Sequence, residues 1–168
     1  MNSKKMVRGA LLVALALALQ SLRMVIPMPL PMSTFIIGTL VHMMLGLTLK
    51  FNGLTAAMFL GFLLPLTAYM QGQVAIVLLV PVIWLGNLLF VLVLHMLSGN
   101  NRLLKLLAAP LAKACVMAVC ALGVVKLVAL PNPAMRTSIL FAMSVPQFIT
   151  AICGILLARQ VLLRLKKF

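Results

Sequence analysis

Long apolar stretches separated by short polar or proline-rich breaks dominate this chain of 168 residues. A helix needs about twenty apolar residues to cross the hydrocarbon core of a bilayer. The breaks leave six segments of this kind, at residues 6–26, 34–50, 53–70, 74–97, 103–130 and 138–165. We therefore predict an all-α integral membrane protein in which six transmembrane helices form one compact bundle over residues 1–168.

The predicted breaks contain the residue types that end helices. Proline cannot continue a helix, and clusters of Gly, Asn and Ser favour turns. The five breaks are PMPLPM from Pro27, Phe51-Asn52-Gly53, Gln71-Gly72-Gln73, Ser98-Gly99-Asn100-Asn101 and Pro131-Asn132-Pro133. All of them are short, so the chain has no room between its apolar segments for a large soluble domain.

Basic residues gather at one set of segment ends, which predicts the orientation of the bundle. If both termini are inside the cell, Arg23, Lys126 and Arg136 fall at outer ends, and Lys113 falls part-way into the fifth segment. The other basic residues fall at inner ends: Lys4, Lys5, Arg8, Lys50, Arg102, Lys105, Arg159, Arg164, Lys166 and Lys167. Lys and Arg are in excess on the cytoplasmic side of helical membrane proteins, so we predict that both termini are inside.

The chain has fourteen Lys or Arg residues and no Asp or Glu, which limits its chemistry. It cannot form a Ser-His-Asp triad, use a carboxylate as general acid or base, or build a carboxylate-rich cation site. His42 and His95 lie on different segments without a second soft ligand at suitable spacing, so we predict no metal site. The charges lie at segment ends, which indicates contact with anionic lipid rather than nucleic acid. We therefore expect neither an enzyme nor a cofactor.

Polar residues within the apolar segments are candidates for function, because they are costly in lipid. On the predicted topology they gather towards the outer side, where they would line a pocket with apolar walls. The candidate lining is Arg23, Tyr69, Gln71, Trp84, Asn87, Lys126, Arg136 and Gln147. Each has a packing alternative, as a buried or lipid-facing aromatic, a hydrogen bond across helices or a cation reaching the headgroups. We interpret His42 as a packed or hydrogen-bonded histidine.

Small residues line one side of the first segment, MVRGALLVALALALQSLRMVI. Ala10, Ala14 and Ala18 recur at every fourth position and therefore share one face of a helix. In lipid, such faces allow two helices to approach closely. The partner is either a neighbouring helix of the same chain or a separate membrane subunit, and the spacing alone leaves both open.

Six short-looped helices with both ends inside, and this alanine pattern in the first, resemble the substrate-binding S components of energy-coupling factor (ECF) transporters. The local sequences that carry the resemblance are VRGALLVALALALQSLR, the proline-rich first outer loop and PVIWLGN in the fourth segment. In length and layout the resemblance covers nearly the whole chain.

The resemblance implies a subunit of a prokaryotic plasma membrane that captures a vitamin, related micronutrient or metal ion from outside. Ala10, Ala14 and Ala18 would dock on a membrane T component, and two cytoplasmic ATPases would drive transport as the S component topples in the membrane. The chain has no Walker loop, so ATP hydrolysis falls to these partners. The nickel and cobalt branch of the family has an N-terminal histidine motif that this chain lacks, which argues against a metal substrate.

The absence of carboxylates also bears on the ligand, since a cationic molecule would find no ion-pair partner in this chain. We expect a neutral or anionic ligand, with Arg23, Lys126 or Arg136 near its acidic group and Trp84 against an apolar part. Two alternatives remain open at this stage. A membrane assembly or scaffold protein would have its interior filled by side chains, and an autonomous secondary carrier would transport without ATPase partners.

Overall fold

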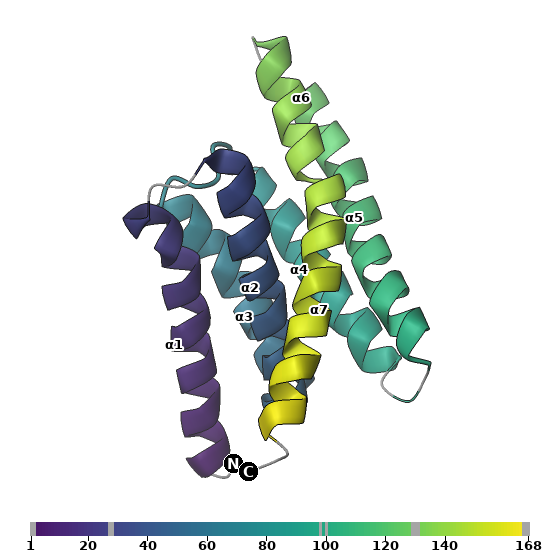
Figure 1. The fold of residues 1–168 in the computed structure, drawn as a ribbon. Helices are drawn as coiled ribbons and strands as arrows, with labels where there is room; N and C mark the ends of the chain where they lie inside the picture. The colour runs from purple at the N-terminus through teal and green to yellow at the C-terminus, as the bar shows by residue number, and fades with distance from the viewer. Residues whose placement is uncertain (1–2, 27–28, 98, 100, 129–131, 166–168) are drawn as a thin grey trace.

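The computed structural model describes residues 3–26, 29–97, 99, 101–128 and 132–165, and the only regular elements in these ranges are α-helices. They are α1 (Ser3–Val25), α2 (Leu30–Asn52), α3 (Leu54–Met70), α4 (Leu79–Met96), α5 (Arg102–Leu127), α6 (Pro133–Ala142) and α7 (Val145–Leu165). Five stretches are long and apolar enough to cross a membrane, with α6 and α7 counted together, and α3 is a shorter apolar helix. The chain is thus a multi-pass membrane protein built as a helical bundle (Figure 1).

Several helix ends differ from the predicted ones. The second helix begins at Leu30 rather than at residue 34, because a proline in the first turn needs no hydrogen-bond partner for its nitrogen. The fourth begins at Leu79 rather than at residue 74, so residues 74–78 lie in the connection after Gly72, whose φ is +70°. The predicted breaks at Pro27, Ser98, Asn100 and Pro131, and the basic residues Lys166 and Lys167, lie outside the described residues.

The predicted sixth segment is two helices, which corrects the prediction of one helix over residues 138–165. The helical structure starts at Pro133 and is interrupted at Met143 and Ser144. The interruption lies just before Pro146, which has no N–H to donate to the Ala142 carbonyl four residues earlier. The Gln147 side chain bonds that carbonyl instead, with Nε2 3.3 Å from its oxygen.

The second helix lies at the centre of the bundle, in contact with α1, α3, α4 and α7. Its apolar side chains pack into the main core, whose fully buried members include Met44, Leu45, Leu60, Phe90 and Ala151. The first helix lies at the edge, and among the described helices it contacts only α2 and α3 (Figure 1). The start of α1 and the end of α7 lie at the same end of the bundle (Figure 1).

Small residues bring α2 and α7 into close contact. A Cβ atom added at Gly154 would collide with the His42 side chain and lie 2.9 Å from the Met43 nitrogen. One turn away on either side, Gly38 faces Thr150 and Gly46 faces Ala158. Each pair is four residues from the next on both helices, so α2 and α7 run parallel in a matched register. We call this six-residue surface the α2–α7 contact.

The first helix is fixed to the bundle along one side only. Near its start, the Asn52 side chain donates a hydrogen bond of 2.8 Å to the Lys5 carbonyl. Near its end, Gln20 donates to the Leu64 carbonyl at 3.1 Å and to the Thr67 hydroxyl at 2.9 Å. On the opposite side, the alanine face formed by Ala10, Ala14 and Ala18 is exposed. Within the described residues, the chain itself does not cover this face.

Candidate functional site

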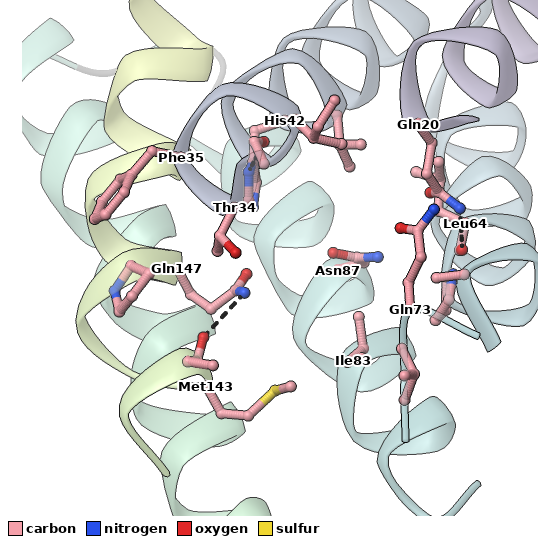
Figure 2. A pocket seen from close by; sticks show the side chains of 18 of the residues that line it. Gln20, Thr34, Phe35, His42, Leu64, Gln73, Ile83, Asn87, Met143 and Gln147 are labelled. Carbon is pink, nitrogen blue, oxygen red and sulfur yellow. Dashed lines mark hydrogen bonds between the residues drawn. The ribbon is translucent and has the colours of Figure 1, made fainter. Parts of the chain in front are cut away.

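A cavity of about 480 Å³ lies in the half of the bundle away from the start of α1. Every helix of the chain contributes to its lining, as does the connection between α3 and α4. Figure 2 shows Met143 and Gln147 on one side of the view and Gln20 and Gln73 on the other, with Ile83 and Asn87 of α4 between them. The volume is in the range of small-molecule sites, about 300–1,000 Å³.

A lysine is completely enclosed in the wall of this cavity. Lys113 of α5 is only 2% exposed, although a charged side chain is rarely buried without a partner. Its Nζ lies 2.6 Å from Asn87 Oδ1 and 2.7 Å from His42 Nε2, and both groups are neutral hydrogen-bond acceptors. The three side chains come from the middle parts of α5, α4 and α2, so they meet deep in the bundle.

The two acceptors are themselves fixed by backbone carbonyl groups. Asn87 Nδ2 donates to the Gly61 carbonyl at 3.1 Å, which turns the amide oxygen towards Lys113. His42 Nδ1 lies 2.6 Å from the Gly38 carbonyl. Because a carbonyl can only accept, Nδ1 carries the proton and leaves Nε2 to accept from the lysine. The resulting Lys113–His42–Asn87 cluster therefore has a defined direction in each of its hydrogen bonds.

A second basic residue lines the cavity in the last turn of α1. Arg23 is half-buried, and its Nη2 donates to the Thr34 hydroxyl at 3.2 Å. Its Nε is buried and has no hydrogen-bond partner among the described residues. The lining thus contains two basic side chains, Lys113 and Arg23, and no acidic one, since the sequence has no Asp or Glu.

Three predicted site residues meet at this cavity, namely Arg23, Asn87 and Gln147. Asn87 and Gln147 also form bonds to backbone carbonyls of the bundle, so both have the packing role that was the alternative interpretation. The structure does not bring the other five predicted residues to this cavity: Tyr69, Gln71, Trp84, Lys126 and Arg136 are not part of its lining.

The helical register explains why the aromatic candidate points away. Ile83 and Asn87 are four residues apart and share the cavity face of α4, whereas Trp84 is turned by about 100° from Ile83. Trp84 instead packs edge-to-face against Phe62 of α3, with 5.7 Å between the ring centroids. It is 37% exposed, which corresponds to the lipid-facing alternative rather than to a ligand contact.

The remaining predicted residues lie near helix ends outside the cavity. Gln71 donates to the Ser21 hydroxyl at 2.8 Å and so connects the end of α3 to α1. Tyr69, Lys126 and Arg136 are exposed. For the two basic residues, exposure near helix ends is compatible with the alternative in which they reach lipid headgroups.

Sequence reasoning missed the central residue of the site. Lys113 is the only charged residue between Lys105 and Lys126, within the apolar stretch LAAPLAKACVMAVC. An ionisable residue inside a membrane segment is by default a functional candidate, and this signal was present in the sequence. The interpretation of His42 as a hydrogen-bonded histidine matches its contacts, but its partner lies 71 residues further along the chain.

A second cavity, of about 720 Å³, lies near the opposite end of the bundle. Its charged lining residues include Lys50 and Arg159, which are exposed at the ends of α2 and α7. In contrast to the first cavity, its lining contains none of the fully buried polar side chains. The first cavity, which holds the Lys113–His42–Asn87 cluster, is therefore the better candidate for selective binding.

Comparison with known proteins adds no further assignment, because no family model, curated protein or solved structure matches the chain. The architecture and the cavity define a class at a coarse level, a multi-pass helical membrane protein with a polar interior site. A more specific function has to be argued from the site itself.

Proposed function

We propose that this chain is the substrate-binding membrane subunit of an ATP-driven importer of the ECF type in a prokaryotic plasma membrane. In this role it captures a small neutral or anionic molecule, a vitamin or related micronutrient, from outside. It docks on a T component through α1, and two partner ATPases hydrolyse ATP. The chain itself is not an enzyme.

The observation that carries the proposal is the cavity in the half of the bundle away from the start of α1. Buried polar groups are costly inside a membrane protein, and a membrane bundle without a ligand has little use for a cavity lined by them. With the start of α1 and the end of α7 in the cytoplasm, as the basic residues predict, the cavity lies in the outer half. A substrate-capturing subunit needs its site in that half.

The exposed alanine face of α1 supports the docking part of the proposal. The first helix packs against the bundle through Ala16 and Gln20, which are buried, while Ala14 lies about half a turn away and is exposed. Packing within the described chain therefore does not account for the ladder. A helix of a T component would approach closely there, because alanine keeps the surface shallow.

The two alternative functions, a scaffold protein and an autonomous carrier, predict different properties of the chain. A scaffold protein predicts an interior filled by side chains, and the cavity of about 480 Å³ counts against this prediction. An autonomous carrier predicts uptake by the chain alone, and the absence of intramembrane carboxylates makes proton coupling through Asp or Glu impossible. The importer is therefore the proposal that uses both the cavity and the exposed face.

The docking step is tested by co-purification with a T component and two ATPases expressed in the same cells. The double variant Ala14→Leu, Ala18→Leu fills the shallow face, and we expect the recovered complex to fall at least fivefold. The control is Gly123→Leu on α5, where an added Cβ atom has no neighbouring atom within 4 Å. This control places a leucine on another exposed surface, and we expect association as in the unmodified chain.

Two results would contradict the proposal. Undiminished association of the alanine double variant would show that the T component docks elsewhere. Substrate uptake into proteoliposomes that contain only this chain would favour the autonomous carrier.

A further inference from the structure

The Lys113–His42–Asn87 cluster holds a lysine for which the chain has no acidic side chain as a counter-ion. Lys113 is 2% exposed, and the sequence contains no Asp or Glu. A buried ammonium group is costly in free energy unless an opposite charge compensates it. Neutral acceptors provide hydrogen bonds but leave the charge without a counter-ion. An anion entering the cavity would supply what the protein lacks.

The hydrogen-bond geometry leaves the lysine one position for such an anion. An ammonium group has three N–H donors, of which Asn87 Oδ1 and His42 Nε2 accept two. Lys113 also lines the cavity, and among the described residues its third donor has no further hydrogen-bond acceptor, only the Phe90 ring with its centroid 6.0 Å from Nζ. A molecule bound in the cavity can therefore supply the third acceptor. Hydrogen bonds to the Gly61 and Gly38 carbonyls fix the Asn87 and His42 side chains. The lysine amine is therefore held in place before any ligand binds.

We propose that Lys113 binds the carboxylate of a small organic acid at the deep end of this cavity, with His42 and Asn87 as positioning residues. This inference rests on the proposed function only in taking the cavity as the substrate site. A carboxylate carries one negative charge, and one of its oxygens can accept the one remaining N–H of the Lys113 ammonium group. A phosphate usually needs several donors, and the backbone N–H groups of the surrounding helix middles are already used within the helices.

The rest of the lining indicates the body of the acid. Phe35, Val41, Leu64 and Ile83 give the cavity apolar walls between its polar groups. Arg23 adds a second positive charge at the outer end, where it attracts an incoming anion and disfavours a cation. The expected ligand is therefore a monocarboxylic acid with an apolar or aromatic body.

Calorimetric titration of the full chain in phosphatidylcholine nanodiscs tests this inference with defined probes. The probes are 1-naphthoate and 4-phenylbutyrate, each compared with its primary amide, which has nearly the same shape but no charge. We expect at least one acid to bind saturably and at least tenfold more tightly than its amide, about 1.4 kcal/mol. If neither acid binds better than its amide, the proposal is overturned.

Variants locate the charge that is responsible. Lys113→Met removes the amine, and we expect acid and amide to bind with equal affinity. The matched control Lys126→Met makes the same change at an exposed lysine outside the cavity and should retain the preference. Lys113→Gln keeps a donor for His42 Nε2 and replaces the methionine variant if that variant does not purify as a single species.

The outcomes separate this inference from the docking proposal. A preference for the acid that persists in both Lys113 variants would overturn the inference. A preference that Arg23→Met abolishes while Lys113→Met retains it would place the anion at the outer cation, which is also a contradiction. The titrations use the chain alone, so a failure to associate with a T component would not alter their result.

Discussion

Two surfaces of this molecule have the same four-residue spacing of small residues, but only one of them is covered by another helix. In the α2–α7 contact, Gly38, His42 and Gly46 meet Thr150, Gly154 and Ala158, and both sets recur at every fourth residue. In the alanine face of α1, the residues at every fourth position are exposed. This spacing indicates that a second helix can approach the surface closely. Only the fold tells whether the partner belongs to the same chain.

The difference also has a functional side. The α2–α7 contact places His42 against Gly154, and His42 in turn accepts a hydrogen bond from Lys113. Close packing of these two helices thus sets the position of a site residue. The alanine face contributes nothing to the interior, because α1 reaches the bundle through its opposite side. One surface positions a residue of the candidate site, and the other is left uncovered by the described chain.

Replacing the tightest residue of the α2–α7 contact should have the largest effect. In Gly154→Leu, the new side chain collides with His42 and with the backbone of Met43 and Thr39, which cannot move without shifting α2. Overpacking of this kind costs about 1–3 kcal/mol and occasionally more, and a clash with backbone belongs to the upper end. We expect a clear fall in the thermal unfolding midpoint in detergent. An unchanged midpoint would mean that the two helices are not in close contact.

The two sides of α1 provide the next comparison. Ala16 is fully buried in the main core, whereas Ala14 is exposed. Ala16→Leu should destabilise the bundle by about 1–3 kcal/mol, because the added side chain has no space. Ala14→Leu should leave the unfolding midpoint unchanged. Equal destabilisation by both variants would contradict the assignment of the alanine face as uncovered.

The sequence predicts the helices well because apolar length alone constrains them. Its errors fall where tertiary or local backbone geometry decides, as in residues 74–78, which are apolar but lie outside a helix. The interruption at Ser144 follows from Pro146, yet proline residues such as Pro65 and Pro110 lie inside continuous helices. A proline therefore predicts a possible break without determining it.

The site was predictable in composition but not in arrangement. Polarity within apolar segments pointed to Asn87 and Gln147, which line the cavity, but the rotation of each helix decides which residues face inward. This rotation separates Asn87 from Trp84, although both lie in the same short stretch of α4. Lys113 and His42 are 71 positions apart in the sequence and lie on different helices, α5 and α2. Helical periodicity relates residues of one helix only, so it cannot predict this contact.

A final prediction tests whether the α2–α7 contact is equally tight along its length. A Cβ added at Gly46 would lie 3.4 Å from the Ala158 Cβ, an ordinary contact, whereas one added at Gly154 meets backbone atoms at 2.9 Å. Alanine is also favoured over glycine within a helix by up to about 1 kcal/mol. We therefore expect Gly46→Ala to leave the unfolding midpoint unchanged or slightly raised, and Gly154→Ala to lower it. If both lower it equally, the helices are closely packed over the whole contact, and His42 is not the one point at which their approach is limiting.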